Sequence, residues 1–76
     1  MPRYFFNVCS DECEEIDLVG RSCPNDVAAL HQALSTASAV LQRRMARDGF
    51  CPRGSIEVED ERHRTVLTLP LRAAAY

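Results

Sequence analysis

Lysine is absent from this sequence of 76 residues, and all nine basic residues are arginine. Against eleven acidic residues they leave a formal net charge of −2. A balanced, slightly acidic chain lacks the positive surface expected of a general nucleic-acid binder. Because a codon bias explains the use of arginine in place of lysine as simply as a binding role does, the missing lysine indicates no ligand by itself.

Long apolar segments are also missing. No eighteen apolar residues run together, and residues 1–6 contain no apolar core of a signal peptide. We therefore expect a cytoplasmic protein that does not interact with a membrane. In that reducing compartment the four cysteines, Cys9, Cys13, Cys23 and Cys51, are expected to be free thiols or ligands instead of disulfides.

The composition that remains is that of one small globular domain, residues 1–76. Hydrophobic residues make up 46% of the chain and charged residues 26%, which lies within the ordinary globular range. A chain this short buries roughly 60% of its unfolded surface, so the core must be efficient or shared with a second copy. We find no low-complexity segment and no linker.

Two strand patterns come before a helix pattern. Residues 3–9 are rich in aromatic and β-branched side chains that alternate between two faces, and they predict a first strand. Residues 14–19 alternate apolar and acidic side chains, and they predict the second strand of a hairpin that Gly20 closes.

A single long helix is predicted over residues 25–48. Asn25 is a good N-cap, and Gly49 is suited to end the helix in a left-handed conformation. Apolar residues recur at intervals of three and four and predict one stripe that faces the sheet. The stripe consists of Val27, Leu30, Leu34, Ala37 and Leu41.

Two further strands are predicted after the helix, at residues 56–59 and 65–71, with a charged turn between them. The predicted fold class is therefore α+β, in the order ββαββ: a mainly antiparallel four-stranded sheet with one long helix packed on one face. Because the first and fourth strands are the most apolar, we expect them to be central. Pro70 cannot donate an N–H, so regular pairing of the fourth strand on its N–H side should stop before Pro70. Pro70 should then mark where the chain leaves the sheet, with residues 72–76 as a loosely held tail.

Several short segments together resemble a known family. These are the opening Met1–Phe6, the Asp17 and Gly20 ahead of Pro24, the Ala28–Ala29 pair, Ile56–Val58 and Leu67–Pro70. In this order they resemble a family of small, stand-alone bacterial proteins classed as a domain of unknown function. The resemblance covers nearly the whole chain and implies no assigned activity and no catalytic residue. The cysteines look like departures from the family pattern.

Neither zinc binding nor catalysis has a strong pattern. Structural zinc sites pair cysteines two to four residues apart, and only Cys9 and Cys13 come close to this spacing, without a matching second pair. A nucleophile needs a base within hydrogen-bonding reach, and neither His31 nor His63 has an identifiable partner. We therefore expect no enzyme activity, no catalytic residue, no metal, no cofactor and no small-molecule substrate.

Two surfaces are candidates for partner binding. The helix is longer than the strands, so its arginine-rich end should extend past the sheet. The second surface is the sheet face that the helix does not cover, where some apolar area should stay exposed. The residues expected to bind a partner are Arg43, Arg44, Arg47, Phe5 and Val66.

The leading functional hypothesis is a non-catalytic protein-interaction module that associates with itself as a homodimer or binds another protein. The alternative is a regulator linked to nucleic acid, because a hairpin followed by a capped, alanine-rich helix is similar in layout to HicB-like antitoxin domains. A thiol or metal sensor ranks last.

Overall fold

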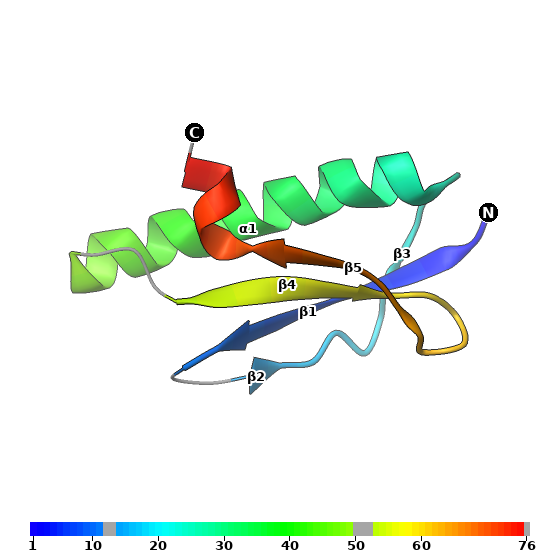
Figure 1. Ribbon diagram of the computed structural model, residues 1–76, viewed down its shortest axis with the longest axis horizontal. Helices are drawn as coiled ribbons and strands as arrows, with labels where there is room; N and C mark the ends of the chain where they lie inside the picture. The colour runs from blue at the N-terminus through cyan, green and yellow to red at the C-terminus, as the bar shows by residue number, and fades with distance from the viewer. Residues whose placement is uncertain (12–13, 50–52, 76) are drawn as a thin grey trace.

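The computed structural model describes residues 1–11, 14–49 and 53–75. Figure 1 shows that the long helix lies across one face of an antiparallel sheet. The predicted α+β class, with one long helix against an antiparallel sheet, is confirmed, although the sheet has five strands. The elements in chain order are β1 (Arg3–Ser10), β2 (Glu14–Glu15), β3 (Arg21–Ser22), α1 (Asp26–Asp48), β4 (Gly54–Glu59), β5 (Thr65–Pro70) and the 3-10 helix η1 (Leu71–Ala75).

The predicted second strand is much shorter than expected. Of residues 14–22, only β2 and β3, of two residues each, pair with β1, and residues 16–20 between them form a loop. The strand order is β2-β1-β4-β5, with β3 also on β1. The first strand is therefore central, as predicted. The prediction that β5 is the other central strand is wrong, because β4 holds that place.

The side chains of β4 explain this error. Ile56 and Val58 are fully buried beneath α1, whereas Glu57 and Glu59 lie on the opposite face of the sheet. The acidic side chains thus mark an exposed face, not an exposed edge. A strand with one polar face can still have hydrogen-bonded neighbours on both sides.

Pro70 belongs to β5, where it lies opposite Ser55. The N–H of Phe6 points away from β4, because it donates to Asp17 Oδ2 at 3.1 Å. Along antiparallel strands, residues whose backbone N–H and carbonyl point toward the neighbouring strand alternate with residues whose groups point away. Counted across β4 from Phe6, this alternation directs the backbone groups of Thr68 and Pro70 away from β4. Proline stands where the sheet requires no donor. Within the described sheet no strand pairs with β5 on that side, and β5 ends at Pro70, where the chain leaves the sheet as predicted.

The helix ends are confirmed. The side-chain oxygen of Asn25 accepts the N–H of Ala28 at 2.9 Å, which caps the first turn. At the other end Gly49 adopts a left-handed conformation with φ of 79°, and its N–H donates to the Met45 carbonyl at 2.8 Å.

The buried face of α1 is rotated relative to the predicted stripe. Val27 is 61% exposed, and Leu30 and Leu34 are only half-buried. Three alanines spaced four residues apart, Ala29, Ala33 and Ala37, belong to the same buried cluster as Tyr4 and Phe6, so the small side chains of α1 face the core and the leucines lie on its flank. The buried residues of α1 are Ala29, Ala33, Ala37, Val40 and Leu41, of which Ala37 and Leu41 were predicted.

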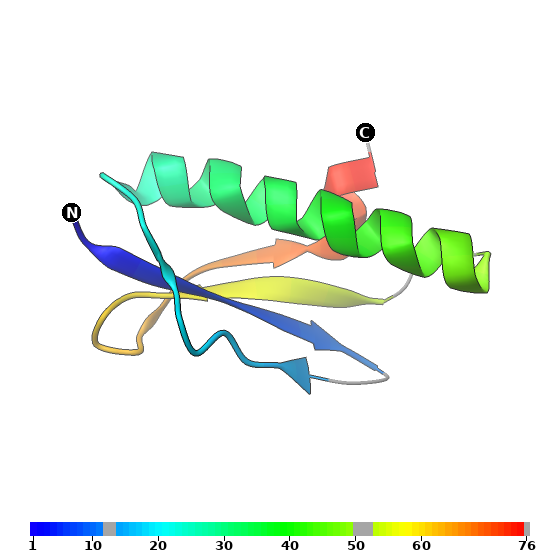
Figure 2. The same ribbon diagram turned by 180° about the vertical axis from the view of Figure 1, so that it is seen from behind.

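The chain after β5 is ordered helix, contrary to the predicted loose tail. Leu71 is fully buried, and η1 packs beside α1 on the helical side of the sheet, as both views show (Figures 1 and 2). Tyr76, which the prediction also included, lies outside the described residues. The described C-terminal residues therefore belong to the packed structure.

Candidate functional site

An apolar groove of about 220 Å³ runs between the N-terminal half of α1 and β5. It is lined by Asp26, Val27, Ala29, Leu30, Val66 and Leu67. One wall of the groove is formed by α1, because its alanine face packs on the sheet and turns Val27 and Leu30 toward the groove. The strand supplies the other side through a bulge: Val58 pairs with Leu67 but Glu59 pairs with Thr65, so the intervening Val66 is an extra residue and remains 42% exposed.

The edge of the sheet beside this groove has no charged protection. The sequence of β5, Thr65–Pro70, contains no ionisable side chain, and among the described strands β5 pairs only with β4. Thr68 directs both its N–H and its carbonyl away from β4. Edge strands usually carry charges or bulges that prevent pairing with another chain. Among the described residues of β5, the features that limit such pairing are the bulge at Val66 and the missing donor of Pro70.

The opposite edge is closed by a side chain. Asp17, in the loop between β2 and β3, accepts the N–H of Phe6 from β1 and those of Val19 and Gly20 from its own loop. Its own N–H donates to the Asn7 side-chain oxygen at 2.9 Å, and Asn7 is buried. We call this arrangement the Asp17 clasp. It satisfies the outer edge of β1 where no strand covers it.

The electrostatics of the clasp follow from these bonds. Partial burial opposes ionisation of Asp17, but the N–H groups of Gly20, Phe6 and Val19 outweigh it and lower the pKa of the carboxyl. Gly20 adopts a φ of 75°, and a β-carbon there would lie 2.8 Å from the Tyr4 carbonyl oxygen, so the turn requires glycine. The ionised carboxylate and Gly20 together hold the loop against β1.

Two of the three predicted arginines are engaged with one carboxylate. Arg47 donates to Asp48 at 2.8 Å, and Arg44 lies 3.9 Å from Asp48 and also donates to Ser10 Oγ. The bond from Arg47 is the main reason that the pKa of Asp48 is lowered. Arg43 is exposed. The last turns of α1 extend past the sheet as predicted (Figure 1), but Asp48 partly neutralises the basic cluster there.

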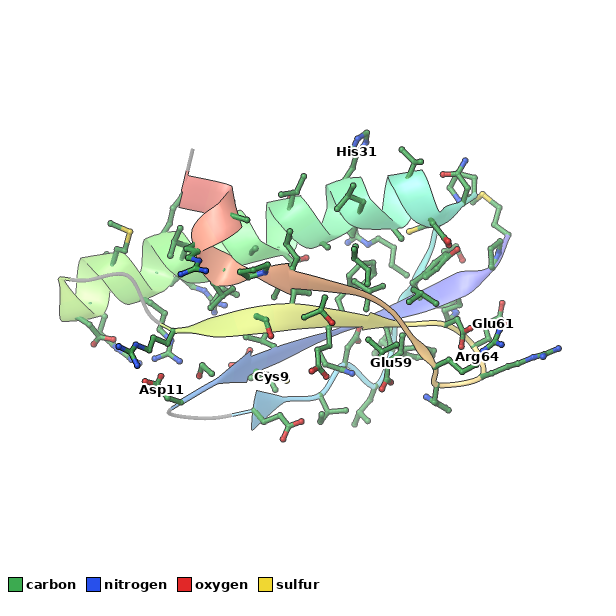
Figure 3. The ribbon with its side chains drawn as sticks, in the orientation of Figure 1. Cys9, Asp11, His31, Glu59, Glu61 and Arg64 are labelled. Atoms are coloured by element: carbon green, nitrogen blue, oxygen red, sulfur yellow. The ribbon has the colours of Figure 1, made fainter. Side chains whose placement is uncertain are left out.

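Phe5 and Val66 do not lie together. Phe5 is half-buried on the face away from α1, with its ring centroid 5.5 Å from that of His63. Val66 lines the groove on the helical side. Figure 3 shows Cys9 and Glu59 on the uncovered side of the sheet. That face is therefore more polar than the predicted apolar patch.

The surroundings of Cys9 do not favour its thiolate. Cys23 is buried, and the pKa of Cys9 is raised, first by burial and then by the negative charges of Glu57 and Glu14. Cys13 and Cys51 lie outside the described residues. Within residues 1–11, 14–49 and 53–75 no three metal-ligating side chains gather at a point. His31 points from α1 away from the sheet (Figure 3).

Sequence reasoning missed Val27, Leu30 and Thr68 as surface residues. The first two were assigned to the core by their hydrophobicity, and the repeat of Ala29, Ala33 and Ala37 was the signal for a closer helix face. The direction of Thr68 could have been found from Pro70, because residues two apart on a strand point the same way and an edge proline directs its nitrogen outward.

Comparison with known proteins places the chain in a family. Residues 3–72 match the family described as a domain of unknown function, DUF6894, and the chain therefore belongs to it. No curated protein and no solved structure matches the chain. In the part of the chain that the structure describes, no helix is long and apolar enough to cross a bilayer.

Proposed function

We propose that this member of the DUF6894 family is a non-catalytic protein-interaction module that associates with itself through the edge of β5 and the adjoining groove. The observation that carries the proposal is the combination of an uncharged edge strand with exposed valines at its side. Val27 and Val66 gain burial when another chain pairs with β5 and covers the groove.

The chemistry of the groove supports a non-catalytic role. Asp26 is the ionisable residue in its lining, and its carboxylate accepts the hydroxyl of Tyr4 at 2.6 Å. This bond, followed by burial and the nearby negative charge, raises the pKa of Tyr4 to about 12. Asp26 thus has a structural partner at the start of α1. An apolar lining with one committed carboxylate suits a polypeptide better than a reacting substrate.

A cytoplasmic location is part of the proposal, because Cys9 and Cys23 are described as free thiols. The alternative of a HicB-like regulator linked to nucleic acid has less support. Its basic surface would be the end of α1, where Arg44 and Arg47 share Asp48.

Sedimentation velocity over a wide range of protein concentration tests self-association. We expect a monomer that converts reversibly to a dimer as the concentration rises. Val66→Lys should weaken the dimer, whereas Val19→Lys, at an even more exposed position on the opposite edge, should leave it unchanged. A chain that remains monomeric at every concentration would contradict the proposal.

A further inference from the structure

We infer that two copies of the chain join β5 to β5 in an antiparallel pair, around a two-fold axis beside Thr68. This inference rests on the proposed self-association and specifies its geometry. The occupant of the open edge is then a second copy, and the two sheets continue into one. Both helices lie on the same side of the joined sheet.

The hydrogen-bond directions select Thr68 as the centre. Thr68 presents both an N–H and a carbonyl away from β4, whereas Pro70 offers only a carbonyl and Val66 sits in the bulge. Suppose that two identical strands pair antiparallel around a residue whose N–H and carbonyl both point outward. The N–H of that residue in each copy then donates to the carbonyl of the same residue in the other copy. Thr68 of one copy therefore bonds twice to Thr68 of the second.

The side chains agree with this register. Leu67 and Leu69 are half-buried on the helical side of β5, and in the centred pair each faces the other leucine of the second copy. Four leucines then meet at the axis and extend the apolar lining of both grooves. On the opposite face the two Thr68 side chains form a cross-strand pair of a favourable kind.

The charge distribution favours a second copy over a partner of opposite charge. Because β5 has no ionisable side chain, pairing the strand with itself brings no like charges together. Arg64, just before the strand, is held by Asp60 at 3.0 Å. A stable interface buries about 800 Å² per partner, which is roughly one sixth of the 5025 Å² of this chain. We expect one six-residue strand and a groove to bury less than that, so the dimer should be reversible.

Disulfide trapping tests the register directly. Thr68→Cys places two thiols at the axis, and mild oxidation should yield a covalent dimer. Trypsin cleaves after Arg64 and Arg72, so mass spectrometry should find residues 65–72 linked to a second copy of the same peptide, which contains no native cysteine. Thr65→Cys is the control, because residue 65 would lie opposite residue 71 and not opposite itself.

A charge at the axis provides the second measurement. Thr68→Lys sets two like charges against each other and should weaken the dimer by about tenfold or more, whereas Thr65→Lys should weaken it less. A dimer that tolerates Thr68→Lys and gives no linked 65–72 peptide overturns this geometry while the proposed self-association stands. A wild-type chain that never dimerises overturns both.

Discussion

The two edges of the sheet differ in how their outward-pointing backbone N–H and carbonyl groups find hydrogen-bond partners. Beyond β1, two short strands and the Asp17 clasp bond the outward N–H groups. Beyond β5, Thr68 retains an unpaired N–H and carbonyl within the described sheet. One edge is closed by the chain itself, and the other, in the described structure, is the edge where we propose that a second copy pairs.

Exposure of apolar side chains does not distinguish these edges. Leu18 and Val19, in the closed edge, are 86% and 75% exposed, more than Val66 at 42%. What differs is the backbone beneath them. The loop that carries Leu18 and Val19 is fixed by its own carboxylate, whereas Val66 lies beside a strand whose hydrogen bonds remain available. An open backbone next to an apolar groove is therefore the better indicator of a pairing surface.

The largest expected effect comes from opening the closed edge. Asp17→Ala removes the acceptor of three backbone N–H groups and should lower the free energy of unfolding by about 3 kcal/mol, because partly buried donors lose their partner. Urea denaturation followed by circular dichroism measures this. Asp11→Ala, an exposed carboxylate near the same hairpin, is the control and should change stability little. A similar loss for both variants would show that the clasp has no special role.

A smaller effect is expected from moving the helix away from the groove. Ala33 is fully buried where α1 meets the sheet, so Ala33→Leu should overpack this contact and cost about 2 kcal/mol. Ala39→Leu on the exposed side of α1 is the matched control, expected to change stability little. Thermal unfolding compares the two. Equal stability would mean that the alanine face is not the packed one.

The alanine face also marks the limit of prediction from the sequence. Asn25 and Gly49 fixed the helix ends because capping depends on local residue types. The face that α1 turns to the sheet depends on how closely the helix can pack. The prediction chose the stripe of larger side chains, with Leu30 and Leu34, and so placed the buried face at the wrong rotation about the helix axis. Hydrophobicity alone does not reveal which face packs more closely.

Strand order was hidden for a related reason. Alternation in β4 shows that one face is polar, but it contains no information about neighbours in the plane of the sheet. The apolar character of β5 was taken as a sign of a central strand, although it arises at an edge beside a groove. The Asp17 clasp joins Asp17 to Phe6 and Asn7, which lie 11 and 10 residues earlier in the chain, so its geometry required the structure.

The pH dependence of stability sharpens the comparison further. The pKa of Asp17 is lowered in the folded chain. The ionised carboxylate therefore stabilises the fold fully when the pH is above the usual pKa range of an aspartate. This stabilisation is lost as the pH falls through the lowered folded value. Asp17→Asn should therefore be less stable than the wild type near neutral pH, and the difference should shrink in acid. Unfolding in urea at several pH values measures this, and a gap that widens in acid would contradict it.

The smallest expected change in monomer stability is at the open edge itself. Val66 is an exposed bulge residue, so Val66→Thr should alter the free energy of unfolding by less than about 0.5 kcal/mol. It should nevertheless weaken self-association, because the threonine hydroxyl reduces the apolar area that the second copy buries. Val19→Thr on the closed edge, which is also exposed, should change neither quantity. Unfolding in dilute solution and sedimentation at high concentration separate the two effects. If Val66→Thr and Val19→Thr leave the dimer equally strong, the groove beside β5 does not contribute to self-association. The proposed functional difference between the two edges would then be contradicted.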